Sequence, residues 1–147
     1  MKITKGVALV LTGKEGCGKS SVARSIASEN GSYIEVGMDK LKGFGLGKVL
    51  NQLPNTVIVE SFTQPTNDEL AEIKEWIAND LIVIDLKGQQ QKTVPLPNFI
   101  FCSNYSAKLN FGKNNRRFKV INLDFEIQKS PSEFKEWVDK KIAAIGG

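Results

Sequence analysis

One octapeptide constrains the fold more than any other part of the chain, the run Gly13-Lys14-Glu15-Gly16-Cys17-Gly18-Lys19-Ser20. It has the pattern of a phosphate-binding loop, in which four residues separate a first glycine from a Gly-Lys-Ser triplet. An apolar run over residues 7–11 precedes it, and a helix-forming segment over residues 21–30 follows it. Because a strand before and a helix after are the context that this loop requires, we expect an α/β fold built around a bound nucleotide.

Each residue type in the loop has a task in phosphate binding. Glycines let successive backbone N–H groups turn toward a phosphate, and the helix N-terminus adds the positive end of its dipole. Lys19 is expected to contact the β- and γ-phosphates of ATP, and Ser20 to provide a ligand for Mg²⁺. The expected nucleotide contacts are Gly13, Lys14, Glu15, Gly16, Cys17, Gly18, Lys19, Ser20 and Ser21.

Composition limits the chemistry. With 147 residues, of which 41% are hydrophobic, the chain fits a single domain over residues 1–147. The net charge of +4 favours a polyanionic partner, although a nucleotide alone explains part of it. The chain has no histidine, which excludes histidine bases, histidine metal ligands and Ser/His or Cys/His nucleophiles. Catalysis therefore has to rest on carboxylates, lysines, arginines and a metal ion.

The rest of the chain reads as further strands and helices. Apolar or β-branched runs predict strands over residues 32–36, 56–61, 98–104 and 118–123, so the central sheet should be mainly parallel. Helices are predicted from Thr66 to Ile77, with Trp76 in the core, and from Pro131 onward. Residues 37–54 are interpreted as a flexible loop before a short helix.

Two carboxylates compete for the role of principal acid. Glu60 ends the strand at 56–61, and in a parallel sheet that end faces the ligand crevice. There it would lie near the γ-phosphate and the metal ion, and could orient or deprotonate the attacking water. Asp85 also ends an apolar run, but Pro95 in the next run argues for an edge hairpin. We take Glu60 as the principal acid and keep Asp85 as its rival.

Later polar residues complete the set of candidates. Asn104 ends the strand at 98–104, where the crevice should lie. Five cationic residues and no acid follow: Lys108, Lys113, Arg116, Arg117 and Lys119. A polar turn with a lysine at each end, Lys87 and Lys92, separates two β-rich runs and predicts a β-hairpin.

This order of parts resembles the ATPase core of superfamily 3 helicases, the AAA+-like replication enzymes of small viruses, phages and plasmids. The resemblance covers roughly residues 6 to 123 and implies an ATP- and Mg²⁺-dependent NTPase with a P-loop fold and a hairpin insertion. By its motifs, Glu60 would be the strand-end acid and Asn104 the amide that contacts the γ-phosphate or the water. Arg116 or Arg117 would be the arginine finger, acting in the site of a neighbouring subunit.

The same resemblance implies partners and a location. The hairpin of that family contacts single-stranded DNA, so Lys87 and Lys92 are candidate DNA contacts. A homo-oligomer such as a hexameric ring, or a partner replication protein, is expected. No run is long enough for a membrane span. Cys17 and Cys102 lack the spacing of a zinc site, and we expect both to be reduced thiols in a cytosolic protein. The expected location is thus the cytoplasm of a bacterium or a phage-infected host.

Two other functions stay open at this point. Small-molecule and nucleotide kinases begin with the same loop and are of this size, although they need several arginines around the substrate. A nucleotide-sensing module with little turnover is the other alternative, because Val59 stands where the helicase family usually has a second acid. The chain is also too short for the domains that normally accompany this core, so we expect a minimal NTPase.

Overall fold

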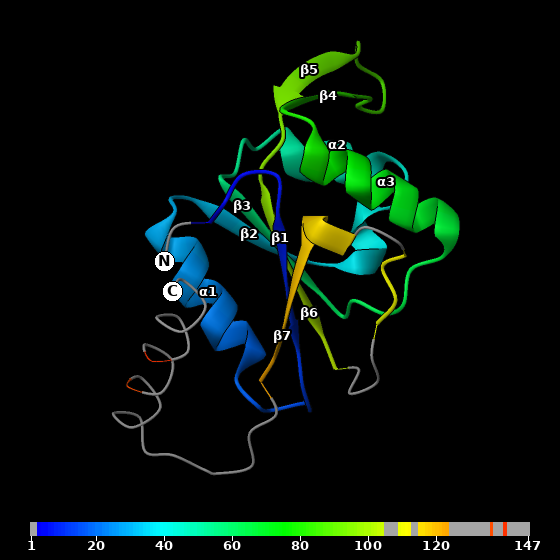
Figure 1. Ribbon diagram of the computed structural model, residues 1–147. Helices are drawn as coiled ribbons and strands as arrows, with labels where there is room; N and C mark the ends of the chain where they lie inside the picture. Colours follow the sequence, from blue (N-terminus) through cyan, green and yellow to red (C-terminus); the bar gives the residue numbers. More distant parts are fainter. Residues whose placement is uncertain (1–2, 105–108, 113–114, 124–135, 137–139, 141–147) are drawn as a thin grey trace.

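The computed structural model describes residues 3–104, 109–112 and 115–123, together with Glu136 and Lys140 (Figure 1). Its strands are β1 (Ala8–Thr12), β2 (Tyr33–Gly37), β3 (Thr56–Glu60), β4 (Leu81–Ile84), β5 (Lys92–Pro95), β6 (Asn98–Ser103) and β7 (Phe118–Asn122). Its α-helices are α1 (Lys19–Glu29), α2 (Phe44–Leu50) and α3 (Asn67–Ala78), and the short 3₁₀ turns are η1 (Met38–Leu41) and η2 (Asn115–Arg117). The helix predicted from Pro131 onward falls almost entirely outside the described residues.

Five strands form one sheet in the order β2-β3-β6-β1-β7. Every neighbouring pair is parallel, which confirms the predicted mixed α/β class with a mainly parallel sheet. The strand that precedes the glycine-rich loop, β1, lies inside the sheet between β6 and β7. Because all five strands run the same way, their carboxyl ends meet at one edge, and this edge collects the residues that follow the strands.

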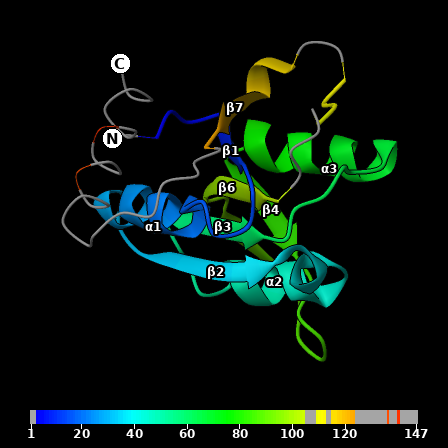
Figure 2. The same cartoon turned by 90° about the horizontal axis from the view of Figure 1, so that it is seen from below.

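The two faces of the sheet bury two separate cores. Side chains alternate along β1, so Leu9 and Leu11 join the cluster under α1, while Ala8 and Val10 join the cluster with α2 and α3. Figures 1 and 2 show α1 on one face and α2 and α3 on the other. Burial on both faces is why these strands are continuously apolar in the sequence, and it packs α1 against the sheet.

The predicted hairpin is confirmed, and it stands apart from the main sheet. β4 and β5 pair antiparallel as a separate two-stranded sheet near α2 (Figure 1). The turn between them contains Gly88 with φ of 76°, a left-handed conformation that favours glycine. Asp85 directly follows β4, so it lies on the hairpin and not at the end of a strand of the parallel sheet.

The short helix expected within residues 37–54 is present as α2, but the glycine-rich stretch belongs to this helix and not to a flexible loop before it. Two of its glycines allow close packing. A Cβ atom on Gly45 would collide with the carbonyl of Lys40, and one on Gly47 would lie 2.9 Å from the carbonyl oxygen of Asp85. The glycines that suggest a loop in the sequence instead let α2 lie against η1 and the hairpin.

Helix α3 begins as predicted. The Glu69 amide donates to Thr66 Oγ1 at 3.2 Å, and the Thr66 amide donates to Glu69 Oε1 at 3.0 Å, which is a capping box. Hydrogen bonds from the backbone and the side chain of Thr66 lower the pKa of the Glu69 carboxyl. Trp76 is buried against Phe99, which confirms its predicted place in the core. Among the described helices, none has the length and apolar character needed to cross a membrane.

Candidate active site

The glycine-rich loop joins the carboxyl end of β1 to the start of α1. Gly16 and Gly18 adopt φ values of 82° and 95°, which L-residues with side chains rarely adopt. The Cys17 amide donates to the Lys14 carbonyl at 3.1 Å, and the Val22 amide donates to the Gly18 carbonyl at 3.0 Å as the helix starts. The two glycines therefore allow the turn that brings the N-terminus of α1 to the edge of the sheet.

Lys19 folds back over this loop. Its Nζ donates to the carbonyl oxygens of Gly13 and Lys14, both at 2.8 Å, and the residue is buried. Neutral carbonyls satisfy hydrogen bonds of the ammonium group without cancelling its charge. The loop therefore keeps a positive potential beside the first N–H groups of α1, an arrangement suited to an anion.

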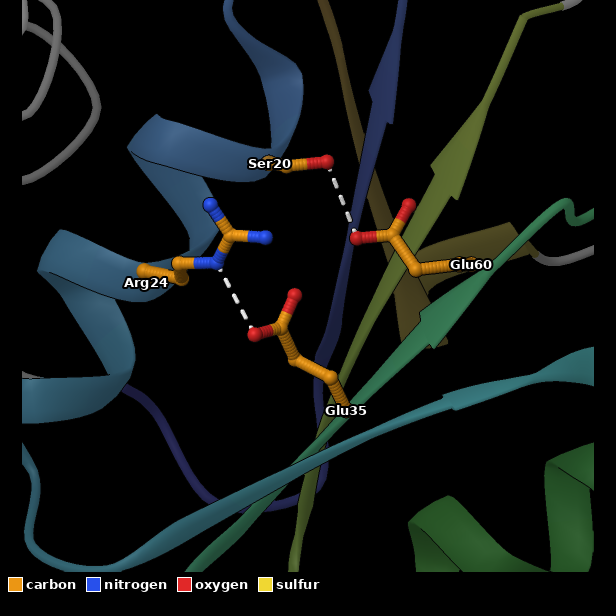
Figure 3. A network of polar contacts seen from close by, with 4 residues as sticks. All are labelled: Ser20, Arg24, Glu35 and Glu60. Atoms are coloured by element: carbon orange, nitrogen blue, oxygen red, sulfur yellow. Dashed lines mark hydrogen bonds and ion pairs between the residues drawn. The ribbon is translucent and has the colours of Figure 1, made fainter.

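A serine and a carboxylate meet in front of the loop. Ser20 Oγ, in the first turn of α1, donates to Glu60 Oε1 at 3.0 Å (Figure 3). Glu60 is the last residue of β3 and pairs in register with Gly37, the last residue of β2. The hydroxyl and the carboxylate therefore lie side by side at the carboxyl edge of the sheet, although 40 positions separate them in the sequence.

These groups share one cavity of about 450 Å³. It is lined by Glu15, Gly16, Gly18, Lys19, Ser20, Ser21, Glu60 and Asn104. Asn104 follows the carboxyl end of β6 and is exposed toward this space. The structure thus brings together the loop, the strand-end acid and the amide that the sequence singles out.

The rival acid lies elsewhere. Asp85 lines a different cavity of about 460 Å³, between α2, α3 and the hairpin, together with Phe44, Trp76 and Glu75. None of the loop residues borders that cavity in the described part of the chain. Glu60, and not Asp85, is therefore the carboxylate beside Ser20.

The arginine pair lies at the opposite edge of the sheet. Arg116 and Arg117 end η2 directly before Phe118, which pairs with Ala8 at the amino end of β1. Arg117 Nη1 donates to the Gly6 carbonyl at 3.4 Å, whereas the Arg116 side chain is exposed. Neither guanidinium lies near the loop of its own chain.

The hairpin lysines also lie away from the loop, and they differ from each other. Lys87 is exposed in the turn after β4. Lys92 starts β5, and its Nζ donates to Asn51 Oδ1 at 2.9 Å, at the end of α2. Two of the five cationic residues, Lys108 and Lys113, lie outside the described residues.

Sequence reasoning missed two charged residues beside the site. Arg24 Nε donates to Glu35 Oε2 at 2.9 Å, and Figure 3 shows this pair next to Ser20 and Glu60. The pKa of Arg24 is raised, first by the hydrogen bond and the negative charge of Glu35 and further by the charge of Glu60. The available signal was the spacing, because Arg24 lies four positions after Ser20 on one helix.

A thiol lies beneath these charges. Cys102 is buried in β6, and burial raises its pKa to about 12, with a further contribution from the negative charge of Glu60. It therefore stays protonated at neutral pH and acts as a small apolar side chain under the site.

Residues 11–117 match the sequence profile of a family described as a family of unknown function, DUF5906. The chain belongs to this family. The matched part of this DUF5906 chain runs from the end of β1 to Arg117 and so contains the loop, Glu60 and Asn104. No curated protein matches the sequence.

Solved structures resemble the DUF5906 chain in fold. The A form apo structure of the NrS-1 C-terminal region matches with a TM-score of 0.65 and 22% identity, over 91% of this chain and 34% of that one. A second apo structure of the same region matches with a TM-score of 0.66 and 20% identity, over the same shares. The chain thus spans about a third of the length of the solved chains that it matches, and at these identities the likeness concerns the fold alone.

Proposed function

We propose that this chain is an ATP-binding domain with a P-loop NTPase fold that hydrolyses ATP with Mg²⁺, similar to the core of superfamily 3 helicases. One observation carries the proposal: Ser20 Oγ lies 3.0 Å from Glu60 Oε1 in the cavity that also contains Lys19 and Asn104. A hydroxyl, an ammonium group, a carboxylate and an amide in front of a helix N-terminus are the groups that hydrolysis of a nucleoside triphosphate needs.

The residues present fit ATP and Mg²⁺. The Lys19 ammonium bonds to carbonyls of its own loop, so a phosphate can replace these partners without breaking an ion pair. Within the described part of the chain, no three side chains of His, Cys, Asp or Glu gather as a metal centre. A cation at Ser20 would therefore take most of its ligands from phosphate oxygens and water, as Mg²⁺ commonly does, and would neutralise phosphate charge.

The chain's own residues then have distinct tasks. The loop amides and Lys19 hold the β- and γ-phosphates, and the Ser20 hydroxyl turns from Glu60 toward the cation. Glu60, released from Ser20, accepts a hydrogen bond or a proton from the attacking water. Asn104, on the neighbouring strand β6, donates its amide to the γ-phosphate or orients the water.

The wider role proposed is DNA replication of the phage or plasmid type, on single-stranded DNA. The resemblance of the motifs to superfamily 3 helicases supports it, and the likeness to the NrS-1 C-terminal region supports the fold on which that resemblance depends. Arg116 and Arg117 lie at the edge opposite their own loop, which suits a finger acting on a neighbouring subunit. We therefore propose an assembly of several copies, or of this chain with a replication partner.

The same geometry speaks against a kinase. Such an enzyme gathers arginines around the acceptor phosphate, yet the chain has only three arginines. Of these, only Arg24 lies at the edge that carries the loop, and Glu35 already binds its Nε.

Phosphate release by the full chain tests the proposal. We expect release from ATP with Mg²⁺, none with excess EDTA, and faster release when single-stranded DNA is added. ATP binding without release would favour the sensor alternative. Transfer of the γ-phosphate to a small acceptor would favour the kinase.

A further inference from the structure

The Arg24–Glu35 pair forms a second polar contact directly beside the Ser20–Glu60 contact. Ser20 and Arg24 lie one helical turn apart on α1, so both face the same part of the sheet. Glu35 lies on β2 and Glu60 on β3, and the two strands are neighbours. Figure 3 shows the four side chains reaching into the space between α1 and these strands.

The register of the strands explains why the two carboxylates are on one face. Glu35 pairs with Ile58, and Ile58 belongs to the core under α1. Because side chains alternate along a strand, Glu60 points to the same face as Ile58. Both carboxylates therefore face α1, which carries the only nearby guanidinium among the described residues.

The guanidinium is bonded to Glu35 and also faces Glu60. Its Nε binds Glu35, and in Figure 3 one terminal nitrogen points toward Glu60. The negative charge of Glu60 adds to the rise in the pKa of Arg24 that Glu35 causes. The charge of Glu60 also raises the pKa of the buried Cys102 thiol, and the charge of Arg24 lowers it. The geometry in Figure 3, with a terminal nitrogen directed at Glu60, is the arrangement in which Arg24 can orient that carboxylate.

This matters most when Ser20 turns toward a cation, because Glu60 then loses the hydrogen bond from Ser20 Oγ. A carboxylate that is free to rotate is a poor base for a water held in one place, since efficient proton transfer needs a fixed geometry. The terminal N–H groups of Arg24 are donors of the right charge to replace the lost bond.

We propose that Arg24 and Glu35 position Glu60: Glu35 holds the guanidinium through Nε, and the terminal nitrogens hold the Glu60 carboxylate toward the attacking water. This rests on the proposed function, and it adds to that function a pair of positioning residues. Glu35, on the neighbouring strand β2, would then be the second acid of the site, whereas position 59, beside Glu60, is a valine.

A plain surface ion pair is the competing explanation. The side chains of Arg24 and Glu35 are 51% and 30% exposed, and exposed pairs of this kind contribute little to stability. Loss of such a pair would leave turnover unchanged. The chain offers a matched control in Lys5 and Asp80, an exposed pair at 2.7 Å that involves none of the loop residues.

The test measures ATP turnover and, separately, ATP affinity by calorimetric titration. In Arg24→Ala we expect kcat to fall about 10- to 100-fold, the range associated with misplaced catalytic groups, with ATP affinity within about twofold of wild type. Arg24→Lys should recover part of the loss because it keeps the charge, and Glu35→Gln should lie between wild type and Arg24→Ala. Lys5→Ala should match wild type.

A double variant decides whether Arg24 acts through Glu60. If it does, Glu60→Gln/Arg24→Ala should be no slower than Glu60→Gln alone, because the group being positioned is already lost. Additive losses would overturn the proposal and indicate direct contact of Arg24 with phosphate. So would weaker ATP affinity at unchanged kcat, or a turnover like that of Lys5→Ala. Wild-type turnover tests the proposed function by itself, and its absence would overturn both proposals.

Discussion

The carboxyl edge of the parallel sheet and the β4–β5 hairpin differ in how far their side chains contact the rest of the chain. At the edge, Ser20, Glu60, Arg24 and Glu35 are joined by hydrogen bonds between α1 and two strands. On the hairpin, Leu81 and Val83 are 59% and 56% exposed, and only Ile84 and Val94 are buried. The contacts of the first region form within one chain, whereas the second region presents apolar side chains outward.

The difference follows from the backbone. Parallel register brings the ends of β1, β2, β3 and β6 to one edge, so the site is fixed by the same contacts that form the core. The antiparallel hairpin pairs only with itself, and a two-stranded sheet gains little stability alone. Any function of the hairpin therefore depends on what binds to it, and substitutions in the two regions should have effects of different size.

The largest effect is expected at the edge, from Lys19→Ala. The loop would lose the side-chain charge that we propose contacts the β- and γ-phosphates, so ATP binding should nearly disappear. Calorimetric titration with ATP measures this directly. Lys40→Ala, an exposed lysine on η1, serves as a control that should bind ATP normally. Ordinary affinity in the Lys19 variant would remove the basis for a phosphate-binding loop.

The next largest effect is expected from replacing Glu60 at the edge, with Asp85 on the hairpin as the comparison. Glu60→Gln should retain ATP but hydrolyse it about 10²- to 10⁴-fold more slowly, because the amide keeps the shape of the side chain but accepts no proton. Asp85→Asn should leave turnover close to wild type, since Asp85 lines a different cavity. Phosphate release at saturating ATP measures both. A crippled Asp85 variant with an active Glu60 variant would move the catalytic centre to the hairpin.

The sequence predicts the edge well because its signals are local. The loop pattern, the continuous apolar strands and the strand-end acid each appear within a few residues, and parallel topology then brings them together. Arg24 and Glu35 could not be predicted in the same way. Their contact depends on the pairing of β2 with β3 and on the rotation of α1, which no short stretch of sequence encodes.

The loop predicted from the glycines of residues 43–47 is instead part of a helix, in which close packing requires two of these glycines. The alternation over residues 43–47 is typical of a loop, yet this stretch belongs to α2 apart from Gly43. The close approach of the Lys40 and Asp85 carbonyls explains the glycines, and both contacts are visible only in three dimensions.

A smaller effect is expected from the arginine pair at the opposite edge. If Arg116 or Arg117 acts on a neighbouring copy, turnover per chain should rise with protein concentration. Mixing Arg116→Ala/Arg117→Ala with Lys19→Ala should recover part of the activity. In the mixed assembly, some subunit interfaces place an intact loop of one chain beside the intact arginines of its neighbour. Turnover that is independent of concentration, with no recovery in the mixture, would argue that each chain works alone.

The smallest effect is expected on the hairpin, where the lysines would contact DNA phosphates. Affinity for single-stranded DNA should fall with salt, with a slope of about −0.7 per phosphate neutralised. Lys87→Ala/Lys92→Ala should flatten this slope by about one to two units and leave ATP hydrolysis without DNA unchanged. Among the single variants, Lys87→Ala should flatten it more, because Lys92 already donates to Asn51.

Lys5→Ala, an exposed lysine outside the hairpin, is the control for loss of a single positive charge. Its slope should stay close to that of wild type, because a specific contact and not the net charge of the chain is being tested. The turn contains no aromatic residue between positions 87 and 92, so base stacking should be weak and sequence preference slight. Equal slopes for wild type, the hairpin double variant and Lys5→Ala would mean that the hairpin lysines are ordinary solvated side chains. DNA, if it binds, would then contact another surface, and the difference between the edge and the hairpin would be one of packing alone.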